Sequence, residues 1–423
     1  MLFASLVTDG FGRRAGMACG GLLCCLGAAL QASTMNLTWF CMARGLLGAG
    51  ATINAASSAA LVIESAHPAH RATFSAIFLT SFSLGGVVAA WTTFGTYVYE
   101  GSASWRIPSS IQAVPSVLQL LGLYWLPESP RWLLSKNKEE AALRMLSKYH
   151  AEGNVNDPVV QFEYDTIIAG LAQEAAANSR NPFQGFREFF RTPGNRHRLA
   201  IVLFGAWCGE SSGSNIVTYY MSPVLMSVGI VSVFDLTLVI AMQQLFAWLT
   251  ATLFALVLTD RLGRRTLFLA SYAAMLFCLV AVTAGSAVYE GDPTNKGAAY
   301  TAITFFFLFF PAYSLGFSGN LGLYVSEILT FHLRVKGIAI FAAFQLIFDV
   351  VNLFVIAIGV TAIAWHLYLI FIGVVVAELV IAYFILPETR GPSLEGVARI
   401  FDGPSACTAT AEGVDNNGTG IAK

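Results

Sequence analysis

Four charged side chains lie inside long apolar runs of this 423-residue chain: Arg44, Glu210, Asp349 and Glu378. A charge in the middle of a membrane is costly unless it is paired or hydrated, so such residues are functional candidates by default. The sequence contains neither a nucleophile beside a base nor a Cys/His cluster with metal-ligand spacing. These residues therefore predict binding of a solute, with no enzymatic reaction, no cofactor and no metal.

A polar stretch, Gly209–Asn215, interrupts one apolar run and is followed by Tyr219 and Tyr220. Its two glycines and three serines have two interpretations. They could form a seam of small residues between packed helices. Alternatively, they could break a helix whose freed backbone and polar side chains line a wet cavity. We favour the broken helix.

Charged turns occur twice. Asp9–Arg14 and Asp260–Arg265 carry the same acidic, glycine and arginine residues, which cannot lie in hydrocarbon and so mark a membrane surface. Two further motif pairs repeat in the same order, namely Glu64 with Arg71 and Glu327 with Arg334, and the segments Pro127–Arg131 and Pro387–Gly391. The repeat distances are 251, 263 and 260 residues, measured from Asp9, Glu64 and Pro127 to their counterparts. The chain is therefore predicted to contain two similar halves.

Composition indicates a membrane protein that crosses the bilayer several times. The chain is 56% hydrophobic and 12% charged, whereas soluble domains carry about 25% charged residues. Ten complete spans are predicted, at 15–35, 38–63, 72–98, 108–126, 199–228, 236–259, 266–289, 299–325, 336–361 and 364–386. Outside the spans, only Arg106 and Lys296 among the 24 basic residues face the side opposite the arginine-rich turns, which places those turns in the cytoplasm. The net charge of −1 gives no indication of nucleic-acid binding.

The predicted organisation has four parts. Residues 1–126 form an N-terminal helical bundle and residues 199–386 a C-terminal six-helix bundle. Between them, 127–198 is a cytoplasmic linker with surface helices near 136–150 and 158–177. Residues 387–423 form a cytoplasmic tail.

The motifs resemble those of the sugar porter family of the major facilitator superfamily. The matching segments are Arg44–Gly50 (RGLLGAG), Pro127–Trp132 (PESPRW), Asp260–Arg265 (DRLGRR), and Pro387–Gly391 (PETRG) with Leu394 and Glu395. Ala89–Thr96, Leu323–Gly337 and Asn352–Phe354 resemble fungal lactose-permease-like and hexose-transporter-like members most.

The resemblance implies an all-α membrane protein with two pseudo-symmetric bundles around a central cavity. It also implies transport of a sugar by alternating access, with proton symport, in the plasma membrane and as a monomer. The family has twelve spans, whereas this chain offers ten and a stub of the second, so about 50 membrane residues are expected to be missing. The proton-carrying Asp of the family belongs to the first span. A non-transporting sugar sensor and an inactive fragment of a transporter gene remain alternatives.

The resemblance also assigns residues. A cytoplasmic latch of ion pairs between the halves is expected to involve Asp9, Arg13, Arg44, Glu64, Arg71, Glu128, Arg131, Asp260, Arg264, Glu327, Arg334 and Glu388. Sugar binding is expected at Glu210, Gly213, Asn215, Tyr219, Tyr220 and Asn352. Gly209 and Glu210 replace two family glutamines. Protonated, Glu210 donates and accepts as glutamine does; ionised, it only accepts. We favour the protonated form, which predicts that sugar binding weakens as pH rises.

Overall fold

The computed structural model describes residues 2–178, 186–227, 229–257, 262–317, 320–389 and 401, and every regular element in them is a helix. The chain divides into two compact units, residues 1–179 and 180–423. Each unit is described here by itself.

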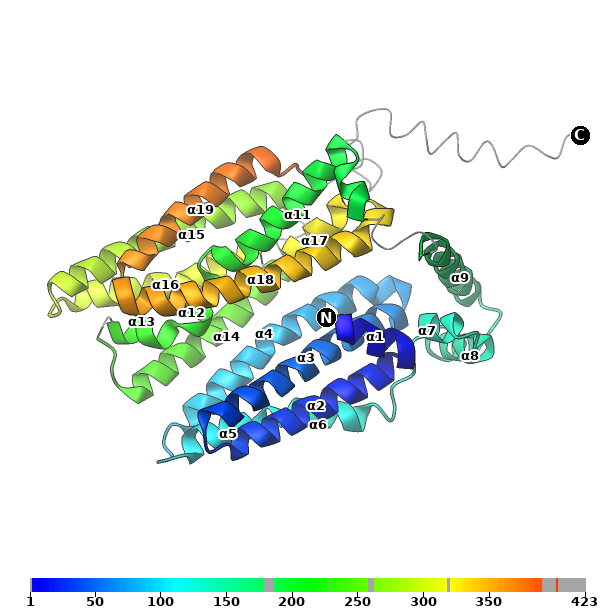
Figure 1. Ribbon diagram of the computed structural model, residues 1–423, viewed down its shortest axis with the longest axis horizontal. Helices are drawn as coiled ribbons and strands as arrows, with labels where there is room; N and C mark the ends of the chain where they lie inside the picture. Colours follow the sequence, from blue (N-terminus) through cyan, green and yellow to red (C-terminus); the bar gives the residue numbers. More distant parts are fainter. Residues whose placement is uncertain are drawn as a thin grey trace, which may run out of the picture. The chain divides into compact units, whose positions relative to one another are not determined.

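The first unit begins with a short helix, α1 (Leu2–Phe11), and three long ones follow: α2 (Arg13–Ser33), α3 (Leu37–Ser65) and α4 (Arg71–Thr96). Helix α3 packs against both α2 and α4, and the three run alongside one another (Figure 1). The next predicted span is broken into α5 (Ala103–Ile111) and α6 (Ala113–Gly122). Pro115 accounts for the break, since it cannot donate the hydrogen bond that a continuous helix requires four residues back.

The linker helices belong to the first unit. They are α7 (Pro130–Ser135), α8 (Glu139–His150) and α9 (Pro158–Asn178), and the last two coincide with the helices expected near 136–150 and 158–177. Ser129 caps α7 by accepting from the backbone N–H of Trp132. His150, the last residue of α8, connects this helix to α9 and α3. Its Nδ1 contacts Glu163 of α9, and its Nε2 lies 3.2 Å from the Ser65 carbonyl at the end of α3. The unit boundary near residue 179 thus differs from the separate linker predicted at 127–198.

The second unit contains α11 (Pro193–Ser211), α12 (Ser214–Tyr219), α13 (Met221–Ser227), α14 (Val233–Val257), α15 (Arg264–Gly291), α16 (Lys296–Gly316), α17 (Asn320–Ile328), α18 (Phe331–Ile363) and α19 (His366–Ile385). Its core is built from α11, α15, α16 and α19, and α18 packs along α11 (Figure 1). Large side chains on the outside, such as Phe354 and Phe384, are exposed by 67% and 79%, as a surface facing lipid requires.

Seven helices in the described part of the chain are long and apolar enough to cross a membrane. They correspond to α2, α3, α14, α15, α16 continued by α17, α18 and α19. The spans built from α5 with α6 and from α11 with α12 and α13 are broken into shorter helices. The predicted number of ten complete spans therefore remains a prediction.

Candidate functional site

The polar stretch of the second unit is a helix break. Helix α11 ends at Ser211, and α12 begins at Ser214. Between them Gly213 has a φ of 97°, a left-handed conformation that costs an L side chain roughly 1–2 kcal/mol. The helix break predicted from the glycines and serines is confirmed, whereas the wet cavity beside it stays a prediction. Gly213 is the residue that makes the turn possible.

Polar side chains on one face of α18 contact this break. Gln345 Nε2 donates to Glu210 Oε1 at 3.2 Å, and Asn215 Nδ2 donates to Asp349 Oδ1 at 3.1 Å. Asn352 Nδ2 donates to Ser211 Oγ at 2.9 Å. The break and the facing side of α18 therefore form one polar network inside the bilayer-spanning part of the unit.

The predicted binding residues fall in or beside this network. Asn215 and Asn352 are buried, with exposures of 5% and 8%, and Glu210 is half-buried. Tyr220 anchors the end of α12, because its hydroxyl donates to the Leu353 carbonyl of α18 at 2.9 Å. Tyr219, by contrast, is 59% exposed.

Sequence reasoning missed Gln345 and gave Asp349 no role in the site. With Asn352 they occupy positions i, i+4 and i+7 of α18, which share one helix face. That spacing was visible in the sequence and could have identified them.

The network can bind hydroxyl groups. The amides of Gln345, Asn215 and Asn352 can each donate and accept, as a polyol requires. The two carboxylates, Glu210 and Asp349, are acceptors when ionised, and no Lys, Arg or His pairs with either one within the described residues. The arrangement therefore offers more acceptors than donors unless one carboxyl is protonated.

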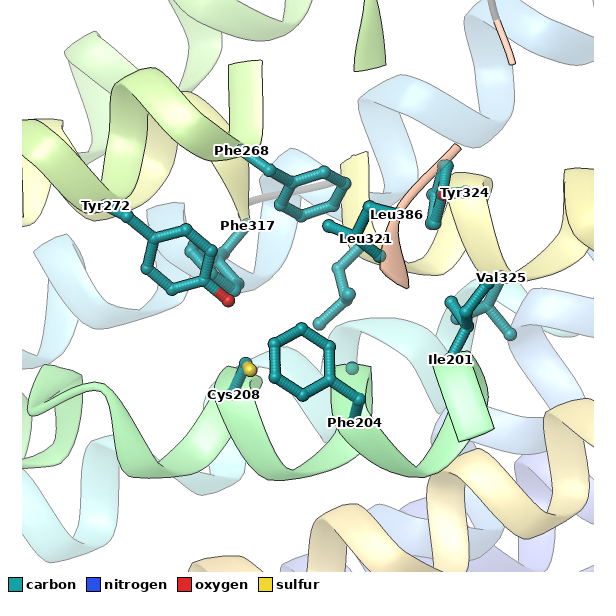
Figure 2. Close-up of a pocket in the computed structure, with 11 residues that line it drawn as sticks. Ile201, Phe204, Cys208, Phe268, Tyr272, Phe317, Leu321, Tyr324, Val325 and Leu386 are labelled. Atoms are coloured by element: carbon teal, nitrogen blue, oxygen red, sulfur yellow. The ribbon is translucent and has the colours of Figure 1, made fainter. Parts of the chain in front are cut away.

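A separate pocket in the core of this unit has a different character. It is lined by Phe204 and Cys208 of α11, Phe268 and Tyr272 of α15, and Leu321 of α17 with neighbouring apolar residues (Figure 2). Its Tyr272 hydroxyl and Cys208 sulfur point toward each other (Figure 2). A lining this apolar offers few hydrogen-bond partners, whereas the network at the break offers several.

In the first unit the repeated motifs form a charged cluster. Arg13 binds Glu64 in a bidentate pair, with Nε–Oε2 and Nη2–Oε1 distances of 2.9 Å, and reaches Asp9 at 3.0 Å. Glu128 accepts from the backbone N–H groups of Arg13 and Arg14, at 3.0 and 3.3 Å. A carboxylate in this position satisfies N–H groups that the start of α2 leaves unpaired and complements its dipole.

The second unit repeats the main contacts of this cluster. Glu388 accepts from the backbone N–H groups of Arg264 and Arg265, at 2.8 and 3.1 Å, and Arg264 pairs with Glu327 at 3.2 Å. Thr389 bonds Glu327 just as Ser129 bonds Glu64. The predicted duplication thus extends to individual hydrogen bonds.

A glycine is required where each motif turns into its helix. A Cβ on Gly12 would lie 2.6 Å from a carboxylate oxygen of Glu128, and one on Gly263 would lie 2.3 Å from Glu388. Both distances are far below contact, so a larger residue would displace the carboxylate from the helix N-terminus.

The structure describes only some of the remaining residues predicted for the latch. Arg131 is half-buried at the start of α7, and Arg334 is half-buried near the start of α18, where its Nε has no hydrogen-bond partner within the described residues. Asp260 lies outside the described residues, as does the side chain of Arg71. All the ion pairs above lie within one unit, so pairing between the halves stays a prediction.

The assignment of Arg44 to the latch is wrong. Arg44 and Glu64 share the continuous helix α3 and are separated by twenty residues, which is about 30 Å along the axis. Arg44 is therefore near the opposite end of the helix from the cluster, and it is exposed.

Comparison with known proteins agrees with this architecture. The family model described as "Sugar (and other) transporter" matches residues 1–401. The MFS-type transporter oryC of Aspergillus oryzae is 28% identical, over 97% of this chain and 76% of the relative. The high-affinity glucose transporter of Kluyveromyces lactis is 26% identical, over 93% and 73%, and sugar transport protein 7 of Arabidopsis thaliana is 30% identical, over 93% and 74%.

Among solved structures, the inward-open xylose transporter XylE from E. coli matches with a TM-score of 0.73 at 19% identity. The match covers 95% of this chain and 85% of XylE, which shows a shared fold. With the family model covering nearly the whole chain, this multi-pass membrane protein belongs to the sugar transporter family of the major facilitator superfamily.

Proposed function

We propose that this chain carries a hexose across the plasma membrane by alternating access, as a monomer, in symport with protons. The observation that carries the proposal is the polar network at the buried break between α11 and α12. Its amides from Asn215, Gln345 and Asn352 match the donors and acceptors of a sugar ring. The names of the yeast and plant relatives support a hexose; a disaccharide such as lactose is the alternative substrate.

Glu210 is proposed to act as a protonatable substitute for glutamine. Protonated, it can donate to a sugar hydroxyl while Gln345 donates to its other oxygen. Ionised, it would stand near a second carboxylate, Asp349, which also contacts Asn215, and the two like charges would repel each other. Sugar affinity should therefore fall as pH rises and Glu210 loses its proton.

The test is Glu210→Gln, with sugar affinity measured by titration calorimetry across pH. We expect the variant to keep its affinity and lose most of the pH dependence. Glu290→Gln is the matched control, because Glu290 is exposed at the end of α15, and it should behave as the unmodified protein. Loss of binding at every pH in Glu210→Gln, or a pH-independent affinity in the unmodified protein, would exclude this role.

We also propose that the two charged clusters act in gating at the cytoplasmic side. Each fixes the N-terminus of a long helix, α2 or α15, through a carboxylate that follows the last span of its half.

A further inference from the structure

One carboxyl group of the second unit is completely buried and contacts the break from α19. Glu378 lies in the middle of α19 and has an exposure of 0%. Its Oε2 lies 2.7 Å from Ser212 Oγ. Its Oε1 is buried and has no hydrogen-bond partner within the described residues.

The single hydroxyl proton of Ser212 bears on the protonation state of Glu378. Ser212 Oγ also lies 2.5 Å from the Cys208 carbonyl, which can only accept. The serine has a single proton for two contacts with oxygen atoms. Both contacts are hydrogen bonds only if Ser212 donates to Cys208 and Glu378 donates to Ser212. The geometry therefore favours a protonated Glu378.

The surroundings contain no charge that would stabilise the ionised form. The titratable groups that face Glu378 are the thiol of Cys208 on α11 and the hydroxyls of Tyr272 on α15 and Tyr313 on α16. All three are neutral at physiological pH by their ordinary chemistry. No Lys, Arg or His pairs with Glu378 within the described residues.

Ser212 connects this carboxyl to the candidate sugar site. It lies in the break between α11 and α12, directly after Ser211, whose hydroxyl is bound by Asn352 of α18. Glu378 thus contacts Ser212, and Asn352 of the polar network donates a hydrogen bond to the preceding residue, Ser211. A rearrangement of the break that breaks the Ser212 contact would also change the surroundings of Glu378.

We propose that Glu378 is a proton-binding residue of this carrier, loaded in the arrangement seen here and coupled to the sugar site through Ser211 and Ser212. When the break rearranges and water enters, the O–H bond of Glu378 breaks, the proton passes to water and a hydrated carboxylate remains. Return of the proton restores the bond to Ser212. This inference rests on the proposed transport function of the break.

Infrared spectroscopy of the purified protein in liposomes tests the proton directly. At neutral pH the unmodified protein should show the carbonyl band of a protonated carboxylic acid, and Glu378→Gln should lose its Glu378 component. Glu290→Gln, the exposed control, should keep it. Ser212→Ala should shift the band, because the acid loses its acceptor. A spectrum that Glu378→Gln leaves unchanged would overturn the proposal.

Transport in the same liposomes separates proton coupling from a static role. Glu378→Gln should retain exchange of labelled hexose for unlabelled hexose and lose accumulation driven by a pH gradient. Accumulation equal to that of the unmodified protein would make Glu378 a structural acid only. Absence of exchange in the unmodified protein would instead refute the transport function, whatever the infrared result.

Discussion

Replacing Arg13 with alanine is expected to unfold or severely destabilise the first unit. The Arg13 side chain is 11% exposed and donates to both oxygens of Glu64, to Asp9 and to the Thr8 carbonyl. Without it, Glu64, itself 15% exposed, keeps the hydroxyl of Ser129 as its one side-chain partner within the part of the chain that the structure describes. Leaving one partner of a buried ion pair uncompensated costs roughly 3–5 kcal/mol, and partial exposure places this pair at the lower end.

The measurement is thermal unfolding of the detergent-solubilised protein. Arg13→Lys should recover only part of the loss, since an ammonium group cannot make the bidentate contact. The matched control is Arg144→Ala, whose ion pair with Glu140 on α8 is 75% and 82% exposed and should change stability by less than about 1 kcal/mol. Equal melting temperatures for Arg13→Ala and Arg144→Ala would contradict the central position of Arg13 in the cluster.

Replacing Gly50 with leucine is expected to separate α2 from α3. A Cβ on Gly50 would lie 2.8 Å from the Cys24 backbone nitrogen and 2.8 Å from the Gly20 carbonyl oxygen. Backbone atoms cannot move aside as a flexible side chain can, so the helices must part. Small residues permit this close approach in membranes, where tight packing drives helix association. Overpacking typically costs 1–3 kcal/mol, and a contact between two backbones should reach or exceed that range.

Gly48 provides an internal control for this prediction. It lies two residues earlier on the same helix, is exposed, and a Cβ there would meet nothing within 4 Å. Gly48→Leu should therefore fold and express as the unmodified chain does, while Gly50→Leu yields little monodisperse protein on size-exclusion chromatography. Indistinguishable elution profiles would show that the two helices are not packed at this seam.

The sequence was most informative where the relevant groups are close along the chain or repeated. The break between α11 and α12 was predictable because glycines and serines interrupt an apolar run. The clusters around Arg13 and Arg264 were predictable as sets of residues because their motifs recur. Their pairing was not, since the contact of Arg13 with Glu64 joins residues 51 apart through the packing of α2 on α3.

The contacts that could not be predicted from the sequence depend on tertiary packing. The position of Arg44 follows from the length of α3, which separates Arg44 from Glu64 by about 30 Å along the helix axis. Glu378 and Ser212 are 166 residues apart, and only the packing of α19 on α11 brings them into contact.

The most direct test of the account is uptake of radiolabelled hexose by yeast cells that lack their own hexose transporters and express this chain. Asn215 is the buried amide that joins the break to α18, and Asn215→Ala removes its bond to Asp349. Thr237→Ala is the control, because Thr237 is half-buried on α14 and its hydroxyl donates to backbone carbonyls of its own helix. We predict saturable uptake by the unmodified chain and by Thr237→Ala, and none by Asn215→Ala at equal surface expression. Uptake that Asn215→Ala leaves intact would contradict the placement of the sugar at this break.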